Sequence, residues 1–230
     1  MQIGILQSGH LSEQIQEEIG DYDILFDQLL SPLGFKLSVW NVVDMEFPDN
    51  IHTCDGWLVT GSRHGVYDPL PFIAKLEAFI RNIYSAKIPL VGICFGHQII
   101  AQALGGRVEK FKGGWSIGAQ RYEHEGKSMI LNAWHQDQVV EVPSSAEVIG
   151  KSDFCENAAM VYGDHVYTLQ QHPEFTRDVV DLLLQYRAPG IVPDSLISQA
   201  KDARGLDLAN AEIANRIAQF FRETHHGHLG

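Results

Sequence analysis

The chain has 230 residues, of which 45% are hydrophobic and 20% are charged, and its formal net charge is -12. This composition is typical of a globular protein with a full hydrophobic core. The acidic balance argues against nucleic acid and anionic membranes as partners, because both require a basic face on the protein.

The sequence carries no signal for a membrane or for secretion. No apolar run approaches the roughly 18 residues of a membrane span, and the segment from Met1 to Leu6 has strand character without the basic start of a signal peptide. The three cysteines are scattered and give no disulfide framework. We therefore expect a cytoplasmic protein with reduced thiols.

The first half of the chain alternates between strand-like and helix-like segments. Apolar runs bounded by turn residues predict strands, and apolar residues spaced by three and four predict helices. The expected strands are 3–7, 37–43, 57–60 and a run up to Cys94, and the expected helices are 24–33, 72–84 and a segment after Cys94. This alternation favours an α/β fold, with a mostly parallel open sheet and helices on both faces.

The second half contains short strand-like runs separated by turn residues, at 119–122, 139–142, 147–151, 159–162 and 166–170. We interpret them as a mixed or antiparallel continuation of the same sheet. Helices are expected over 178–186 and 209–221, with prolines and glycine breaking the chain between them. We expect a catalytic domain over residues 1–190. A helical extension over 191–230 should pack on that domain through apolar residues at helical spacing, namely Ile213, Ile217, Phe220 and Phe221.

The segment Gly92-Ile93-Cys94-Phe95-Gly96 lies where an expected strand meets an expected helix. It has the pattern of a nucleophile elbow with cysteine in place of serine. Such a sharp turn crowds the backbone and requires flanking positions without side chains. The sulfur would lie at a helix N-terminus, which favours a thiolate. The alternative is a structural cysteine, as we expect for Cys54 and Cys155, which lack an elbow.

A cysteine nucleophile needs a histidine base and an acid that orients it. His172 precedes Pro173, so the chain should be extended there, and His172 and Glu174 would then share one face. A surface turn with no role is the alternative. The reaction also needs N–H groups aimed at the oxyanion, and the candidates are the amides of Phe95 and Gly61.

The other histidines are weaker candidates for the base. His97 lies on the first helical turn, where we expect its side chain to point away from the sulfur. His135 lies in Trp134-His135-Gln136, which we interpret as a substrate-binding loop. The cluster of His225, His226 and His228 suits a disordered tail better than a metal site. We expect no metal and no cofactor.

The two motifs, Gly92-Ile93-Cys94-Phe95-Gly96-His97-Gln98 and Gln171-His172-Pro173-Glu174, resemble those of the class I glutamine amidotransferases. The resemblance covers roughly residues 1–186 and implies hydrolysis of the glutamine side-chain amide through a cysteinyl thioester, with release of ammonia. It makes Cys94, His172 and Glu174 the triad. The residues that it implies around the glutamine α-amino and carboxylate groups are Gln98, Gly114, Trp115, Trp134, His135 and Gln136.

Two departures from the family pattern bear on function. The oxyanion loop, often Gly-Gly-Pro in the family, is Thr60-Gly61-Ser62-Arg63 here, and no synthetase domain is expected after residue 186. The chain thus resembles stand-alone members similar to the GMP synthase glutaminase domain, some relatives of which are γ-glutamyl peptidases. The substrate is then glutamine or a γ-glutamyl compound, a separate synthetase subunit is a possible partner, and a non-catalytic regulatory or binding module is the alternative.

Overall fold

The computed structural model describes residues 1–227, with side chains up to residue 224, so the histidine cluster at 225–228 lies outside the described side chains. The strands are β1 (Gln2–Leu6), β2 (Lys36–Trp40), β3 (Gly56–Val59), β4 (Leu90–Ile93), β5 (Arg107–Lys110), β6 (Ser116–His124), β7 (Lys127–His135), β8 (Asp137–Glu141), β9 (Glu147–Lys151), β10 (Ala159–Tyr162) and β11 (Val166–Leu169). The helices are α1 (Glu13–Ile19), α2 (Tyr22–Leu30), α3 (Pro71–Ser85), α4 (Phe95–Ala103), α5 (Arg177–Tyr186), α6 (Asp194–Asp202) and α7 (Asn210–Gly227).

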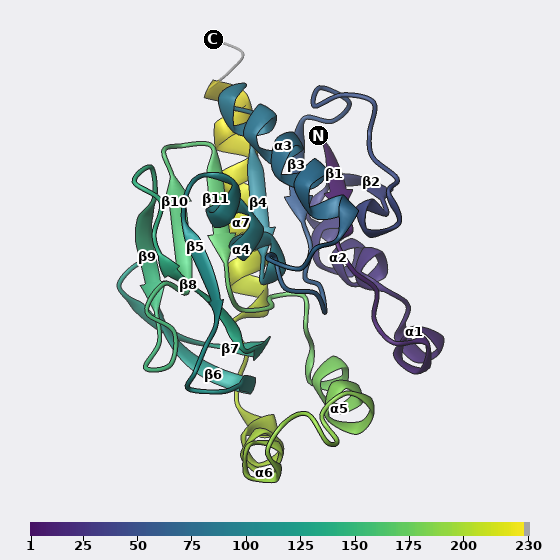
Figure 1. Ribbon diagram of the computed structural model, residues 1–230, viewed down its shortest axis with the longest axis vertical. Coiled ribbons are helices and arrows are strands. Elements are labelled where there is room, and N and C mark those ends of the chain that lie inside the picture. Colours follow the sequence, from purple (N-terminus) through teal and green to yellow (C-terminus); the bar gives the residue numbers. More distant parts are fainter. Residues whose placement is uncertain (228–230) are drawn as a thin grey trace.

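Across the described residues the main sheet has nine strands, in the order β2-β1-β3-β4-β11-β10-β9-β6-β7 (Figure 1). Neighbours from β2 to β11 pair in parallel, and those from β11 to β7 pair antiparallel. The strands β5 and β8 form a separate antiparallel pair. The predicted α/β fold is therefore confirmed, as is the mixed continuation of the sheet in the second half of the chain.

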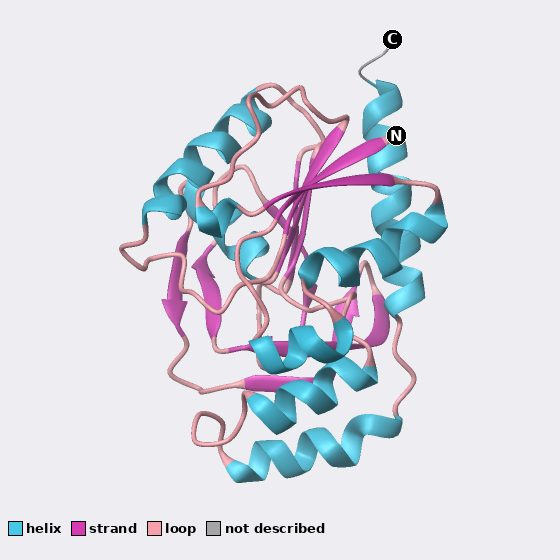
Figure 2. Cartoon of the chain, turned by 90° about the vertical axis from the view of Figure 1, so that its right-hand side faces the viewer, coloured by secondary structure: helices cyan, strands magenta, loops and turns pink. Residues whose placement is uncertain are grey.

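The sheet separates two hydrophobic cores because successive side chains of a strand point to opposite faces. In β3, Leu58 belongs to one core, whereas Trp57 and Val59 belong to the other. Helices α2, α5 and α7 supply residues to the first core, and α3 and α4 supply residues to the second. Figure 2 shows the strands in the middle with helices on both sides. The candidate site lies at the carboxyl ends of β4 and β11, which are parallel neighbours in this sheet.

The last helix packs on the core of the chain, as its apolar spacing predicts. Ile213, Ile217, Phe220 and Phe221 are all buried in the first core. The ring of Phe221 lies edge-on to Phe35 at a centroid distance of 5.8 Å. This helix therefore contributes to the stability of the sheet, since each fully buried side chain of this size is worth about 1.5–3 kcal/mol.

The sequence did not predict α1, β5, β7 and α6, and some of the predicted elements begin or end at other residues in the structure. Helix α1 buries Ile15 on an otherwise polar segment, so the apolar periodicity that marks a helix is missing. The expected helix 24–33 is α2 from Tyr22, followed by a 3-10 turn at Ser31–Leu33 that contains Pro32. The expected strand 37–43 ends at Trp40, because a second 3-10 turn follows at Val42–Asp44.

The segment Trp134-His135-Gln136 is not the loop that we expected. Trp134 and His135 are the last two residues of β7, which pairs with β6 along its whole length, and Gln136 alone separates β7 from β8. The strand β7 lies at the edge of the sheet, where polar residues are common, and its polar composition therefore did not indicate a strand. The segment nevertheless reaches the candidate site from the end of that strand.

Candidate active site

The turn at Cys94 is a strained strand-to-helix elbow. Strand β4 ends at Ile93, α4 begins at Phe95, and Cys94 between them has φ 52° and ψ -101°. A non-glycine residue with positive φ carries a conformational cost and often marks a functional site. The Cys94 amide donates a 2.7 Å hydrogen bond to the carbonyl of Leu169, which holds the elbow against β11.

The two glycines of the elbow are required by backbone packing. A Cβ atom on Gly96 would lie 2.2 Å from the carbonyl oxygen of Val59. A Cβ atom on Gly92 would lie 2.6 Å from the carbonyl carbon of Gly96. In both cases the obstacle is backbone, which cannot rotate away as a side chain could. The close approach of β4, α4 and β3 therefore explains the glycine pattern of the motif.

We expect Gly96→Ala to destabilise the protein, because the new methyl group would force α4 away from β3. Overpacking of this kind typically costs about 1–3 kcal/mol, to be measured as a lower free energy of unfolding in urea. Gly205→Ala is the control, since a Cβ atom there meets nothing within 4 Å. Equal losses of stability in the two variants would contradict the packing requirement at Gly96.

His172 and Glu174 form a buried pair next to the elbow. The Nδ1–H of His172 donates to Oε1 of Glu174 at 2.7 Å, and the two side chains are 2% and 0% exposed. The His172 ring stacks on Phe175 at a centroid distance of 3.9 Å, and its backbone amide donates to the carbonyl of Asn132 at 2.9 Å. Because Nδ1 bonds to Glu174 and the ring is fixed, Nε2 is the nitrogen available to exchange a proton with Cys94. Cys94 and His172 line the same pocket.

Electrostatics favour a charged imidazole at this position. Burial lowers the pKa of His172, but the negative charges of the Cys94 thiolate and of Glu174 outweigh burial and raise it to about 10. The His172 imidazole is therefore protonated at neutral pH. A protonated imidazole beside the sulfur is the general acid that an acyl transfer needs.

Two glutamines, Gln170 and Gln98, connect the sulfur to the chain after β7. Nε2 of Gln170 donates to Sγ of Cys94 at 3.6 Å. Nε2 of Gln98 donates to Oε1 of Gln170 at 3.0 Å and to the carbonyl of Asp137 at 2.9 Å. The sequence did not single out Gln170. The available signal was a polar residue directly after a buried strand and close to His172.

The amides predicted for the oxyanion belong to segments next to Cys94 and His172. The amide of Phe95 is the first of α4, and the first amides of a helix have no partner within the helix. The carbonyl of Thr60 accepts a 3.1 Å hydrogen bond from Gly96, which holds the Gly61 loop against the start of α4. A Cβ atom on Gly61 would lie 3.1 Å from Cε1 of His172. Gly61 thus permits the loop to approach the imidazole.

Cys94 lies on the border of two adjoining pockets. The first, which we call the α5 pocket, is lined by His172, Tyr22, Phe175, Leu183 and Arg187 together with residues of the loop after β1. The second, the β7 pocket, is lined by Gln98, Trp115, Trp134, His135, Gln136 and Asp137. Five of the six residues implied for substrate binding therefore meet in the β7 pocket. Gly114 lies outside its lining, in the turn before β6.

The two rival histidines are buried and uncharged. Nδ1 of His97 lies 2.9 Å from Oγ1 of Thr168, and burial together with His135 lowers the pKa of His97 to about 3. Burial and the positive charge of His172 lower the pKa of His135 to about 3. His97 is thus anchored to β11, and His135 supports the wall of the β7 pocket.

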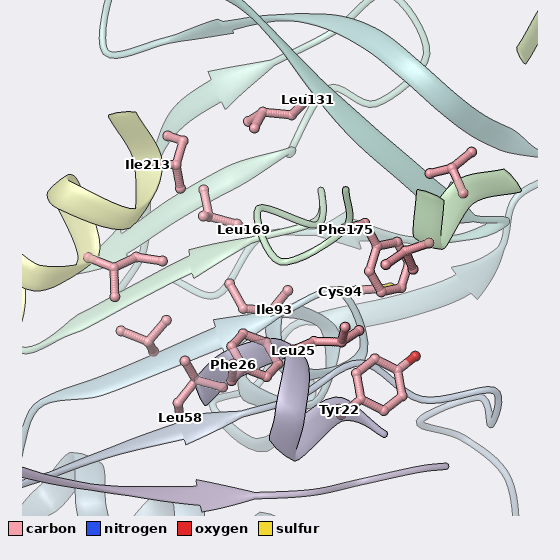
Figure 3. Packing of buried hydrophobic residues seen from close by; sticks show 14 of the residues in the cluster. Tyr22, Leu25, Phe26, Leu58, Ile93, Cys94, Leu131, Leu169, Phe175 and Ile213 are labelled. Carbon is pink, nitrogen blue, oxygen red and sulfur yellow. The ribbon is translucent and has the colours of Figure 1, made fainter. Parts of the chain in front are cut away.

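Tyr22 is a further residue of the site that the sequence did not indicate. Its ring is stacked with Phe175 at a centroid distance of 6.3 Å, and Figure 3 shows both rings at the same end of the core as Cys94. Burial and the charges of Cys94 and Glu174 raise its pKa well above the ordinary value, so the phenol stays neutral. As the first residue of α2, it reaches the site only through the packing of that helix on the sheet.

We expect iodoacetamide to alkylate Cys94 at pH 7 much faster than the other cysteines. All three are free thiols, but burial raises the pKa of Cys54 to about 11 and that of Cys155 to about 12, which leaves both as unreactive thiols. Peptide mass spectrometry after a short exposure measures the site of labelling. Cys94→Ser is the control, and rapid labelling of Cys54 or Cys155 in either protein would contradict the expectation.

The parallel sheet with a cysteine elbow after β4 and a His–Glu pair after β11 is an arrangement of the amidotransferase class of α/β proteins. The sequence matches the family described as Glutamine amidotransferase class-I over residues 23–182. Because the match spans more than half of the chain, the chain belongs to this family, and the predicted family is confirmed. Among the described residues, no helix has both the length and the apolar character to cross a membrane.

Known proteins similar to the chain include two kinds of enzyme. Gamma-glutamyl peptidase 2 of Arabidopsis thaliana is 28% identical over 207 residues, which cover 84% of this chain and 84% of that protein. One of the subunits of the glutamine-hydrolyzing GMP synthase of Methanopyrus kandleri is 34% identical over 119 residues, covering 44% of this chain and 61% of that protein. The family and these relatives indicate a hydrolytic or amidotransferase enzyme.

The fold is shared with solved structures at low sequence identity. The structure of a glutamine amido transferase from Methylobacillus flagellatus superimposes with a TM-score of 0.72 at 21% identity, covering 98% of this chain and 93% of that chain. The similarity therefore extends beyond the matched family region and includes the C-terminal helices.

Proposed function

We propose that this protein is a cysteine-dependent hydrolase of γ-glutamyl amides, acting on glutamine or on γ-glutamyl peptides. The observation that carries the proposal is the strained Cys94 next to the buried His172–Glu174 pair. The Cys94 thiolate attacks the γ-carbonyl carbon, and the amides of Phe95 and Gly61 stabilise the oxyanion.

The tetrahedral intermediate then collapses to a thioester. The carbon–nitrogen bond breaks, and Nε2–H of His172 gives its proton to the departing nitrogen, which leaves as ammonia or an amine. A water molecule, deprotonated by the now neutral His172, attacks the thioester carbonyl. The carbon–sulfur bond breaks, glutamate leaves, and the thiolate–imidazolium pair is restored. Glu174 holds the imidazole in place throughout.

The β7 pocket is the proposed site of the γ-glutamyl part of the substrate. Trp115, Trp134, His135 and Gln136 line it directly, and Gln98 lines it and also supports Gln170. Gly114 contributes through the turn that places Trp115, since its φ of 91° suits glycine. Small polar and aromatic groups of this kind can orient an amino acid through its α-amino and carboxylate groups.

A γ-glutamyl peptide is the favoured substrate over glutamine coupled to a synthetase. The similarity to a γ-glutamyl peptidase extends over 84% of the chain, against 44% for the GMP synthase relative. A glutaminase that serves a separate synthetase subunit is the second candidate, which the family itself supports. The intact array of Cys94, His172 and Glu174 argues against a non-catalytic binding module.

Two further features are part of this proposal. Residues 1–190 would form the catalytic domain, because every proposed site residue precedes position 190. The segment from residue 191 would be an extension, and its described part packs on that domain through Ile213, Ile217, Phe220 and Phe221. The site lies in a reducing compartment such as the cytoplasm, since all three cysteines are free and catalysis requires Cys94 as a thiolate.

The test is a kinetic assay of the purified chain with glutamine and with a panel of γ-glutamyl peptides. We expect the chain alone to release amine from at least one peptide, with kcat/KM at least as high as for ammonia release from glutamine. The physical reason is that the complete catalytic array is already assembled within one chain. Release that begins only when a cell-extract fraction is added would contradict self-sufficiency and favour the synthetase-coupled glutaminase.

A further inference from the structure

The α5 pocket has a chemistry that the proposed binding of the γ-glutamyl part leaves unused. Phe175 and Leu183, from the loop after β11 and from α5, together with Leu11 after β1, form apolar walls. Arg187, directly after α5, is half-buried and also lines this pocket. A half-buried cation at this pocket, in a chain with a formal net charge of -12, points to an anionic ligand.

The position of His172 decides which part of the substrate enters this pocket. His172 lines the α5 pocket and is absent from the lining of the β7 pocket. The leaving nitrogen must meet Nε2 of His172 to take up its proton, so the amine departs into the α5 pocket. The acyl part stays on the other side of Cys94, among the groups of the β7 pocket.

Arg187 is the cation available to hold an anion there. Within the part of the chain that the structure describes, no carboxylate pairs with its guanidinium. Arg187 lines both pockets. Burial and the charges of Cys94 and Glu174 raise the pKa of Tyr22, and the positive charge of Arg187 acts in the opposite direction, so Arg187 lies close enough to Tyr22 to affect it. Tyr22 lines the α5 pocket alone, which places the charge of Arg187 on that side.

The other cationic groups near the pocket are less suited to this role. His10 lies between two carboxylates, with Nδ1 2.5 Å from Asp21 and Nε2 2.9 Å from Asp44, so its charge is already compensated. Arg63 is exposed on the loop between the two pockets. Arg187 is therefore the group whose desolvated charge gains most from a carboxylate partner.

We propose that the leaving group is an α-amino acid, that its nitrogen meets His172 in the α5 pocket, and that Arg187 binds its carboxylate. The inference rests on the proposed hydrolase function and specifies its substrate class. Arginine and carboxylate form paired hydrogen bonds with fixed geometry, which would orient the scissile nitrogen towards His172. The side chain of the leaving amino acid would extend out of the α5 pocket, whose volume of about 40 Å³ is too small to hold it.

The test compares γ-glutamylleucine with γ-glutamylleucinamide, which lacks the carboxylate. For the wild type we expect kcat/KM to be higher for γ-glutamylleucine, with the amide about 10- to 100-fold lower, mainly through KM, as suits a hydrogen bond to a charged group. In Arg187→Gln this preference should disappear, and Arg187→Lys should restore part of it. Arg81→Gln, a change on α3 away from both pockets, should keep the wild-type ratio.

Each other result overturns a defined part of the proposal. A wild type that cleaves both substrates with equal kcat/KM would refute the carboxylate requirement while leaving the hydrolase function intact. If Arg187→Gln lowers kcat/KM equally for γ-glutamylleucine and its amide, Arg187 serves the γ-glutamyl part instead. Absence of cleavage by the wild type with every γ-glutamyl compound would refute the proposed function itself.

Discussion

Cys94→Ala is expected to abolish the hydrolysis of every γ-glutamyl amide, with kcat/KM lower by on the order of 10⁴ or more. The elbow holds the sulfur next to His172, and neither pocket offers a second nucleophile in that position. Without the sulfur no thioester forms, and direct attack by water would have to use an array built for a thiolate. The measurement is kcat/KM for the best γ-glutamyl peptide.

The fold should survive this change, because alanine keeps a Cβ atom and the Cys94 amide keeps its hydrogen bond to Leu169. Circular dichroism and urea unfolding would verify that. Cys94→Ser should be similarly inactive, since a hydroxyl is a far weaker nucleophile than a thiolate beside an imidazolium. Cys155→Ser is the control with an unreactive buried cysteine. Full turnover by folded Cys94→Ala would disprove the covalent mechanism.

The sequence predicts the elbow well because every constraint on it is local. Strand, turn and helix follow one another within a few residues, and the glycines at 92 and 96 are demanded by backbone contacts that the motif always creates. The extended segment before Pro173 predicts that His172 and Glu174 share a face, and the pairing of β11 with β4 brings both of them to the end of the sheet where Cys94 lies. Their catalytic roles remain proposals that the variants test.

The parts that the sequence did not predict depend on contacts between distant segments. Gln170 reaches the sulfur because β11 pairs with β4, and Tyr22 reaches the triad because α2 packs on the sheet. Neither residue stands in a recognisable motif. The edge strand β7 is polar enough to resemble a loop until its pairing with β6 is known. Short motifs therefore identify the reacting groups, whereas tertiary packing supplies the residues that surround them.

His172→Ala is expected to lower kcat/KM by about 10³-fold or more, because both half-reactions need a proton transfer at Nε2. Glu174→Gln should be milder, at roughly 10- to 100-fold, since the ring would still stack on Phe175 and the backbone would still bond to Asn132. Activity lost in His97→Ala or His135→Ala but retained in His172→Ala would show that the base has been misassigned. His52→Ala, at an exposed position, is the control for a surface histidine.

The pH dependence of stability gives a second measurement on the same variant. The Cys94 thiolate and Glu174 overcome the effect of burial and raise the pKa of His172 from 6.5 to about 10 in the folded protein. A raised pKa means that the folded state binds the proton more tightly than the unfolded state does. The stabilisation by His172 is therefore fully present below pH 6.5 and is lost as the pH rises towards 10. Urea unfolding between these limits should show a decline for the wild type that is weaker in His172→Ala, and identical slopes would contradict the imidazolium assignment on which the proton transfer to the leaving amine depends.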